Sequence, residues 1–233
     1  MKKRLAIIGV SGRMGAELLS LAPDFHFQVT SGVGRTKLSV ENVAIVDHVS
    51  KLDPSSVDVV VDFSLPELTD DVVAWCEKNK KPLVSGVTGI SAAQKSKITS
   101  LAKSTAALWA PNMSLGIAVL SRMLIELRHL EGFDFQIEEA HHKHKKDKPS
   151  GTALFLQEKL EKAVGADVPP PVAIRGGGIF GIHKVWAMGE EESITLEHTA
   201  NNRRVFARGA LKAATWLLSQ PPGHYVLADV LTR

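Results

Sequence analysis

The chain has little of several features that would place it in a class at once. Its 233 residues include one cysteine, Cys76, so neither an internal disulfide nor a zinc-cysteine cluster can form, and buried filler is its expected role. No apolar run approaches the roughly 20 residues that cross a bilayer. The basic N-terminus precedes only four apolar residues, 5–8, which is too few for a signal peptide. We therefore expect a cytoplasmic location and no association with membranes.

A large excess of charge is also lacking. Lysine and arginine number 28 against 25 aspartate and glutamate residues, and a net charge of +3 is too mild to imply a nucleic-acid partner. Hydrophobic residues make up 44% of the chain and charged residues 23%, which is ordinary for a folded protein of one large or two small domains. Charge is therefore expected to matter locally, not over the whole chain.

Apolar runs and helical patterns alternate through the first half of the chain. Strands are predicted at residues 4–9, 27–33, 57–63, 82–85 and 106–110, and helices at 13–22, 66–79 and 91–104. Near-continuous apolar strands separated by helices are typical of a parallel sheet that is covered on both faces. This half of the chain is therefore predicted to belong to the α/β class.

Glycines follow the first predicted strand directly. The sequence Gly9-Val10-Ser11-Gly12-Arg13-Met14-Gly15 has the spacing G-x-x-G-x-x-G, a variant of the dinucleotide-binding pattern G-x-G-x-x-G. Such glycines allow a tight turn, close approach of the backbone to a diphosphate and close helix–strand contact. A plain turn is the alternative, but the position between strand and helix favours a cofactor site in which Arg13 could reach a phosphate. Residues 1–112 are thus predicted to form a Rossmann-type dinucleotide-binding domain.

The residues that distinguish NADPH from NADH are expected at the end of the second strand. An acid there would bind the ribose hydroxyls of NAD, but residues 31–37 contain none. Arg35, assisted by Lys37, could instead hold a 2′-phosphate, so NADPH is favoured and NADH is the alternative. Two later strands end in Gly86-Val87-Thr88-Gly89 and Ala110-Pro111-Asn112-Met113-Ser114. Each could be a mere turn, but together they predict the nicotinamide half of the site, because such sheets bind ligands at the carboxyl ends of their strands.

The pattern changes after Asn112. Helices are predicted at 114–131 and 149–164. Strands are predicted at 133–140, in a segment that ends at residue 188, and at 192–198. Such a grouping indicates an α+β domain with a mixed open sheet over residues 113–207, whose sheet could face partner subunits. A last helix at 208–219 has an apolar face that could return to the first domain, so 208–233 would complete that domain.

Histidines and lysines gather at residues 138–153, ahead of a Pro-Ser-Gly-Thr helix start. A solvated surface run is one interpretation. A metal site is another, but Lys143 and Lys145, interleaved with the histidines, would repel a cation, so we expect no metal. The third interpretation is an anion pocket with a proton donor, since histidine titrates near neutrality and a helix N-terminus offers free N–H groups to anions. The clustering of the histidines and the helix start favour this third interpretation.

These motifs together resemble the 4-hydroxy-tetrahydrodipicolinate reductase family, also called dihydrodipicolinate reductase, of the diaminopimelate route to lysine. Residues 139–153, from Glu139 to Ala153, are similar to its signature E-x-H-H-x-x-K-x-D-x-P-S-G-T-A. Supporting segments are 12–15, 62–64, 86–89, 110–114 and 175–183. The resemblance implies an NAD(P)H-dependent oxidoreductase that reduces the 4-hydroxy-tetrahydrodipicolinate/dihydrodipicolinate substrate to tetrahydrodipicolinate, and it implies a homotetramer.

The resemblance also assigns roles. It implies that His141 donates a proton, that Lys145 assists, and that His142 with Gly151 and Thr152 binds a substrate carboxylate. The cofactor contacts that it implies are Gly9, Val10, Ser11, Gly12, Arg13, Met14, Arg35, Gly86, Val87, Thr88, Ala110, Pro111, Asn112 and Met113. Gly34 departs from the acid found in many members, which weakens NADH binding in this interpretation.

Two rival hypotheses are kept. Another two-domain reductase, such as an aspartate or diaminopimelate dehydrogenase, would share the glycine turn but not the His-Lys-Pro-Ser-Gly-Thr run. A nucleotide-sensing module would bind NAD(P) without turnover. Oxidation of the cofactor in the presence of substrate separates an enzyme from a sensor.

Overall fold

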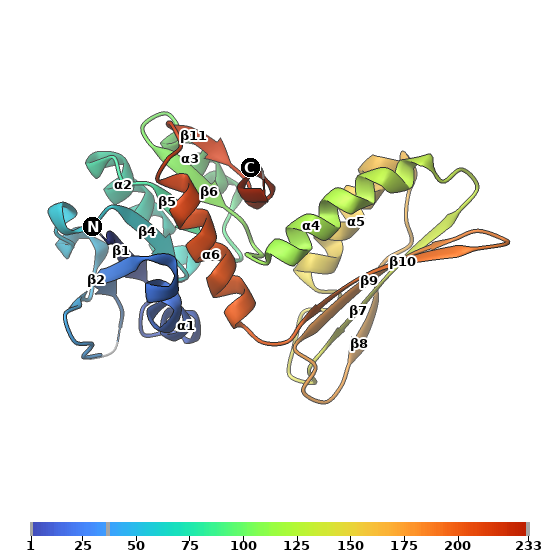
Figure 1. Cartoon of the computed structure of the whole chain (residues 1–233), viewed down its shortest axis with the longest axis horizontal. Helices are drawn as coiled ribbons and strands as arrows, with labels where there is room; N and C mark the ends of the chain where they lie inside the picture. Colours follow the sequence, from blue (N-terminus) through green and yellow to red (C-terminus); the bar gives the residue numbers. More distant parts are fainter. Residues whose placement is uncertain (1, 36–37, 232–233) are drawn as a thin grey trace. The chain divides into compact units, whose positions relative to one another are not determined.

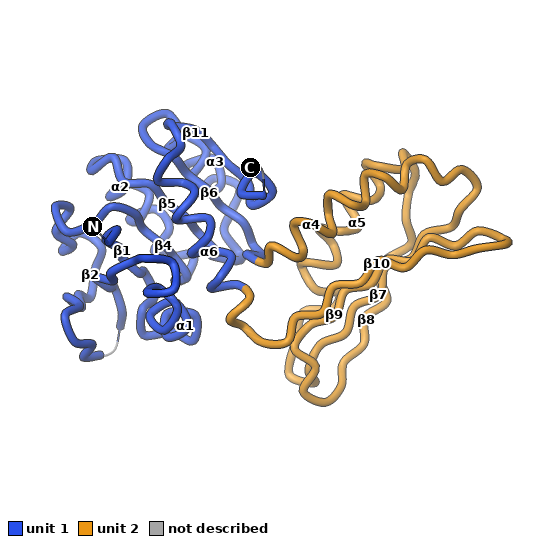
Figure 2. The backbone as a smooth tube through the Cα atoms, viewed as in Figure 1, with its two compact units in different colours: residues 1–113, 206–233 blue, residues 114–205 orange. Residues whose placement is uncertain are grey.

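The computed structural model describes residues 2–35 and 38–231. The chain divides into two compact units (Figure 2). Unit 1 comprises Met1–Met113 and Phe206–Arg233, and unit 2 comprises Ser114–Val205. No helix in the described ranges is long and apolar enough to cross a bilayer. Each unit has its own sheet and its own apolar core.

Unit 1 is built on a seven-stranded sheet whose order is β11-β6-β5-β4-β1-β2-β3. All six pairings within it are parallel. The strands are β1 (Lys3–Ile8), β2 (Phe27–Val33), β3 (Ala44–Val46), β4 (Val59–Asp62), β5 (Leu83–Ser85), β6 (Ala106–Trp109) and β11 (Gly223–Tyr225). The helices are α1 (Arg13–Leu21), α2 (Thr69–Asn79), α3 (Ala92–Leu101) and α6 (Arg204–Leu217), which lie around the sheet in Figure 1. The predicted Rossmann-type α/β fold is confirmed.

The central strands of unit 1 are apolar on both faces because helices cover both. Val59, Val60 and Val61 of β4 are fully buried, and their side chains alternate between the two faces. Val60 lies in the same apolar cluster as α2 and α3, which also contains Cys76. Cys76 is buried and makes no disulfide, in agreement with its expected role as filler.

Two strands of this sheet were not predicted. β3 and β11 are three residues each and lie at the two edges of the sheet, and three residues are too few to show the periodicity of a strand. The helix predicted from residue 66 begins instead at Thr69, because Pro66 opens a separate 3₁₀ turn over Pro66–Leu68. β11 pairs with β6, so the C-terminal segment completes the sheet.

Unit 2 has a four-stranded sheet of order β10-β9-β7-β8. The strands are β7 (Asp134–His141), β8 (Val172–Arg175), β9 (Gly181–Met188) and β10 (Ser193–Ala200). β7 and β8 are parallel and the other pairings are antiparallel, so the predicted mixed open sheet is confirmed. Helices α4 (Leu115–Met123) and α5 (Gly151–Val164) share an apolar cluster with Ile137 and Val185, and so cover one face of the sheet (Figure 1).

Two elements of unit 2 and the final helix differ in detail from the prediction. The single helix expected at 114–131 is α-helical only to Met123 and continues as a 3₁₀ helix over Leu124–His129. β8 was not predicted, because an edge strand of four residues is too short to show the periodicity of a strand. The final helix, expected from residue 208, begins one turn earlier at Arg204.

Candidate active site

The glycine turn of unit 1 is shaped by backbone contacts. Gly9 has φ +81°, and a Cβ atom there would lie 2.7 Å from the carbonyl oxygen of Phe63. A Cβ atom on Gly15 would lie 2.2 Å from the carbonyl oxygen of Val10, so no larger residue fits between helix and turn. Gly12 is the N-cap of α1 and has no side chain that could occupy the first-turn N–H groups. The turn therefore leaves donors and space for a diphosphate, which Arg13 in the first turn of α1 could approach.

The end of β2 borders an open pocket of about 450 Å³. Its lining residues are Gly34, Arg35, Leu38, Ile45, Val46, Asp47 and Lys51. Lys37, which we expected to assist Arg35, lies outside the described residues. Asp47 enters this pocket because β3 runs parallel to β2, with Val33 opposite Val46.

Asp47 was missed by the sequence analysis, which searched for an acid only after β2. Its carboxylate is 2.8 Å from Lys51 Nζ, and this contact lowers the pKa of Asp47. The pocket therefore contains one acid and two cations, Lys51 and Arg35. Such a set can bind either ribose hydroxyls or a 2′-phosphate.

The two later turns lie at the same edge of the sheet. Gly86 N donates to the carbonyl oxygen of Asp62 at 2.8 Å, and Ala110 N donates to that of Ser85 at 3.1 Å. Val87 is buried and accepts a hydrogen bond from Trp109 Nε1 at 2.9 Å through its carbonyl oxygen. Met113, at the end of the second turn, is also buried. These turns bring the remaining predicted cofactor residues, Thr88, Pro111 and Asn112, to the carboxyl ends of β5 and β6.

Asp62 is a buried carboxyl group at this edge, at the end of β4. Its Oδ1 accepts a hydrogen bond from Ser64 N at 2.9 Å. Burial raises the pKa of Asp62 to about 6, against the lowering effect of Ser64. Asp62 thus holds the turn that follows β4, in which Phe63 lies against Gly86.

In unit 2, a buried carboxylate holds the histidine that we expect to donate a proton. His141 ends β7, and its Nδ1 is 2.5 Å from Oε2 of Glu139, which is fully buried. Arg175 of β8 donates from Nη1 to Glu139 Oε2 at 2.8 Å and from Nη2 to Oε1 at 2.6 Å. Ser150 N donates to Glu139 Oε1 at 3.0 Å. Because an ionised carboxylate only accepts, Nδ1 of His141 carries a proton and Nε2 is the nitrogen left for chemistry.

The pKa values in this cluster follow from burial and charge. Burial raises the pKa of Glu139, but hydrogen bonds from Arg175, His141 and Ser150 hold it below its ordinary value. Burial lowers the pKa of His141; Glu139 opposes this effect, whereas Lys145 and Arg175 add to it. Glu139 is therefore a fixed negative charge beside an imidazole that is neutral near neutral pH.

The other predicted residues of unit 2 lie around the start of α5. Lys145 Nζ is 2.9 Å from Asp147 Oδ2, and this contact lowers the pKa of Asp147 despite partial burial. Ser150 caps α5 by accepting from Ala153 N at 3.2 Å, and a Cβ atom on Gly151 would meet nothing within 4 Å. The backbone N–H of Gly151 already faces the Asp147 carboxylate, so a ligand carboxylate at the N-terminus of α5 would take the place of Asp147.

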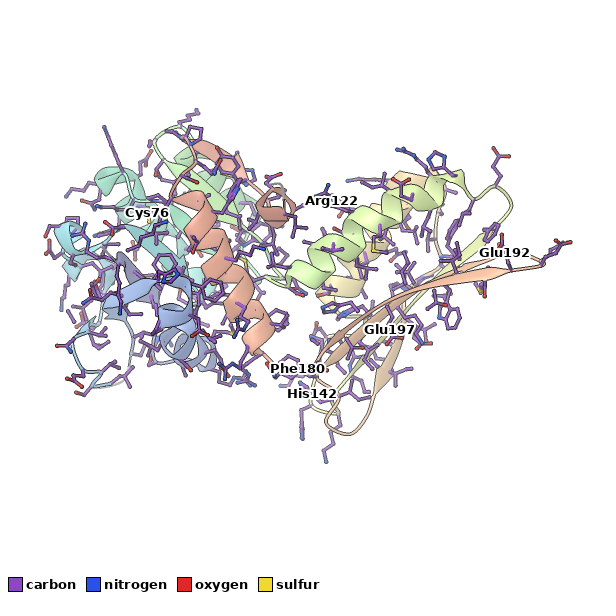
Figure 3. All side chains as sticks on the ribbon, viewed as in Figure 1. Cys76, Arg122, His142, Phe180, Glu192 and Glu197 are labelled. Atoms are coloured by element: carbon purple, nitrogen blue, oxygen red, sulfur yellow. The ribbon has the colours of Figure 1, made fainter. Side chains whose placement is uncertain are left out.

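His142 follows the strand and lies at the same end of unit 2 as Phe180 (Figure 3). Its buried Nδ1 has no hydrogen-bond partner among the described residues. A buried donor or acceptor without a partner costs about 1–3 kcal/mol, so this nitrogen is suited to a ligand.

His183 of β9 is a further buried residue here to which the sequence analysis gave no role. Its Nε2 lies 3.2 Å from Ser150 Oγ, and its ring centroid is 5.2 Å from that of His141 in an edge-on arrangement. Burial, aided by the neighbouring His141, lowers the pKa of His183 to about 4. Glu139, Arg175 and His183 are missed partners that lie on three strands; only Glu139, two residues before His141, could have been found from strand periodicity.

Metal ligands are not gathered in this cluster or elsewhere in the described chain. No group of three His, Cys, Asp or Glu side chains is placed there to hold an ion.

Comparison with known proteins gives the family. Family models described as "Dihydrodipicolinate reductase, N-terminus" and "Dihydrodipicolinate reductase, C-terminus" match residues 3–113 and 116–231. A 4-hydroxy-tetrahydrodipicolinate reductase of Bdellovibrio bacteriovorus is 45% identical over 235 residues, covering 99% of this chain and 97% of that one. One from Xanthomonas euvesicatoria is 42% identical over 238 residues, covering 98% and 97%.

Solved structures are similar in fold. A dipicolinate-bound dihydrodipicolinate reductase from Paenisporosarcina sp. TG-14 has a TM-score of 0.86 at 21% identity, covering 99% of this chain and 100% of that one. Aspartate dehydrogenase from Thermotoga maritima has a TM-score of 0.55 at 15% identity, covering 94% and 98%. The fold alone is thus shared with one rival class, whereas the sequence relationship is specific. The chain belongs to the dihydrodipicolinate reductase family of pyridine-nucleotide-dependent oxidoreductases, as the resemblance of its His/Lys segment predicted.

Proposed function

We propose that this chain reduces the 4-hydroxy-tetrahydrodipicolinate/dihydrodipicolinate substrate to tetrahydrodipicolinate in the diaminopimelate pathway of lysine biosynthesis. The observation that carries the proposal is His141, held by Glu139 at 2.5 Å and close to Lys145, in a chain of this family. Such a cluster can protonate and bind a dicarboxylate.

In the proposed reaction His141 is the proton donor. A bound reduced nicotinamide supplies the hydride. Nε2 of His141 gives its proton to the carbon next to the one that is reduced, and the positive charge of Lys145 assists. Because burial makes His141 neutral near pH 7, the dianionic substrate must favour its protonated form when it binds. Positioned proton transfer of this kind contributes about 10²–10⁴-fold to the rate.

We assign the substrate carboxylate to His142, Gly151 and Thr152. The unpaired Nδ1 of His142 and the first-turn N–H groups of α5 support this assignment. Lys145 would exchange its partner Asp147 for the substrate, which costs little because Asp147 is more than half exposed.

We assign the cofactor diphosphate to the turn from Gly9 to Met14, and the nicotinamide side to 86–88 and 110–113. On the adenosine side, Arg35 and Lys51 support NADPH as the favoured cofactor. Asp47 supports retained use of NADH, since its carboxylate can accept from ribose hydroxyls. Residues 1–112 with 208–233 would bind the dinucleotide, and 113–207 would bind the substrate.

We further propose a homotetramer, located in the cytoplasm, in which the outer face of the unit 2 sheet contacts partner subunits. Val172 is 51% exposed, Ile174 44% and Met188 37%. Their register places them on the face opposite the α4 and α5 core, together with Trp186. Three exposed apolar side chains on one sheet face are unusual for a surface that meets only water.

The direct test is incubation with NADPH and the product of dihydrodipicolinate synthase. We expect the nicotinamide absorbance to fall only when that product is present. Binding of NADPH without oxidation would favour the sensor hypothesis, and oxidation with aspartate-type substrates alone would favour the rival dehydrogenase.

A further inference from the structure

The two oxygens of Glu139 have separate sets of partners. Oε2 contacts His141 Nδ1 and Arg175 Nη1, whereas Oε1 contacts Arg175 Nη2 and Ser150 N. One carboxylate therefore contacts the end of β7, the end of β8 and the N-cap residue of α5. All of these residues belong to unit 2.

We propose that Glu139 is a positioning residue that couples the proton donor to the carboxylate-binding helix. It fixes the tautomer and orientation of His141, and through Ser150 it fixes the start of α5 at the same time. This inference rests on the proposed function, because it concerns the same reaction and the same site.

The orientation follows from the contact geometry. A carboxylate at Nδ1 holds the imidazole in the tautomer that carries its proton there, so Nε2 alone exchanges a proton with the substrate. Gly181 of β9 leaves room beside that nitrogen, since even a Cβ atom would lie only 3.2 Å from Nε2. A larger residue at 181 would crowd the reactive nitrogen.

Arg175 keeps the carboxylate ionised and in place. Its two-pronged contact with Glu139 is the geometry in which guanidinium and carboxylate bind most specifically. The same guanidinium donates from Nη2 to the carbonyl oxygen of Asp147 at 2.6 Å, and the Asp147 side chain pairs with Lys145. Arg175 therefore links Glu139 to the loop that carries Lys145.

A purely structural ion pair is the competing explanation. Buried pairs contribute unevenly to stability, and loss of one partner is costly whatever the function. The two explanations differ in what they predict for proton transfer. The charged or titratable groups around His141 are Glu139 on its own strand, Arg175 on β8, His183 on β9 and Lys145 in the following loop. Of these, only Glu139 favours the protonated imidazole.

The test compares Glu139→Gln with Glu138→Gln. Gln at 139 can still accept from Arg175 and Ser150, but it offers an amide N–H instead of a carboxylate to Nδ1 of His141. Glu138 is the neighbouring residue on the opposite face of β7, opposite Lys184. We expect kcat of Glu139→Gln to fall roughly 10²-fold with NADPH affinity unchanged, and Glu138→Gln to behave as wild type.

The pH profile separates positioning from stability. His141 must be protonated to act, so kcat/KM falls as pH rises through its pKa. Loss of the Glu139 charge should move this falling limb to lower pH by roughly one unit or more. A falling limb that stays in place, or an equal loss of kcat in both variants, would overturn the proposal.

A measurement on the wild-type protein keeps the test valid if Glu139→Gln does not fold. Imidazole ¹⁵N shifts, assigned to His141 by their loss in His141→Ala, should show Nδ1 protonated and Nε2 unprotonated at high pH. The reverse tautomer would overturn the proposal. A wild-type chain that does not oxidise NADPH with substrate would instead contradict the proposed function itself.

Discussion

The two units contain candidate sites of opposite construction. In unit 1 the site is made of backbone: glycines at 9 and 15 leave no room for a Cβ atom, and N–H groups at the start of α1 are the proposed ligands. In unit 2 the site is made of side chains, with Glu139 at its centre and partners on two strands and at the N-cap of a helix. A backbone site depends on residues close in sequence, whereas a side-chain site depends on which strands become neighbours.

Each unit also contains a buried titratable group, and the two respond to pH in opposite directions. Asp62 in unit 1 has its pKa raised to about 6, and His183 in unit 2 has its pKa lowered to about 4, both chiefly by burial. Both are uncharged only between about pH 4 and pH 6, because burial penalises the charged form of each group.

The largest effect should come from the side-chain site. We expect His141→Ala to lower kcat by about 10²–10⁴-fold, because the proton donor is lost, and to leave NADPH affinity unchanged. Steady-state kinetics and cofactor titration would measure both quantities. Replacement of the neighbouring Lys143 by Met is the control, since that lysine is outside the cluster. Unchanged turnover would remove His141 from the mechanism.

The glycine turn of unit 1 should be disrupted by the addition of a side-chain atom. In Gly15→Ala the new Cβ atom would lie 2.2 Å from the carbonyl oxygen of Val10, so the turn must shift. We expect weaker NADPH binding and a destabilisation of about 2–4 kcal/mol, seen by titration and denaturant unfolding. Gly178→Ala is the matched control, because its Cβ atom would meet nothing within 4 Å. If both variants bound NADPH as wild type does, the steric account of the turn would be wrong.

Acid should affect the two units in opposite ways. Between pH 6.5 and about 4 the unfolded chain protonates His183 and the folded chain does not, so unit 2 loses at most about 3 kcal/mol as pH falls. Between about pH 6 and pH 3.8, Asp62 keeps a proton in the folded chain that it releases in the unfolded chain. Unit 1 therefore gains stability as the pH falls.

Hydrogen exchange of β9 and β4, corrected for the intrinsic effect of pH, would measure this contrast. The variants His183→Gln and Asp62→Asn should each remove the contribution of the replaced group to the pH dependence, and only in its own unit. Parallel changes in the two units would refute the assignment.

A smaller effect is expected from Lys145→Met. Loss of this charge should lower kcat/KM by about 10-fold through weaker binding of the anionic substrate, as one charge-assisted hydrogen bond contributes about 1.5–3 kcal/mol at most. Initial rates at low substrate concentration would show it, with Lys148→Met as a control for general electrostatic attraction. If kcat/KM fell equally in the two variants, Lys145 would only contribute to the general electrostatic attraction of the substrate.

The smallest effects should concern cofactor choice. We expect Asp47→Asn to raise the NADPH/NADH preference a few-fold, and Lys51→Met to lower it, because the pair is exposed and screened by water. Ratios of kcat/KM for the two cofactors would test both. If both substitutions changed the NADPH/NADH preference in the same direction, this pocket would be excluded as the site that selects the cofactor. Gly34→Glu is less suitable, because a Cβ atom there would lie 2.9 Å from Ser11 Oγ in the phosphate turn.

Much of the fold was predictable from local patterns. β2 has the predicted bounds, Phe27–Val33, because it lies between the Pro23 turn and Gly34. β3, β8 and β11 were missed, since edge strands of three or four residues are too short to show the periodicity of a strand. The missed β3 explains the missed Asp47, because an acid at the end of β2 was sought along the chain and came from the neighbouring strand.

The sequence by itself determined the parallel α/β sheet, the glycine turn and the segment that carries His141, since each depends on residues adjacent in the chain. Only the tertiary structure decided that Arg175 reaches Glu139 across 36 positions, that His183 lies beside His141, and that Asp47 enters the pocket beside Arg35. The physical reason is strand pairing: hydrogen bonds between backbones set the register, and the register sets which side chains meet.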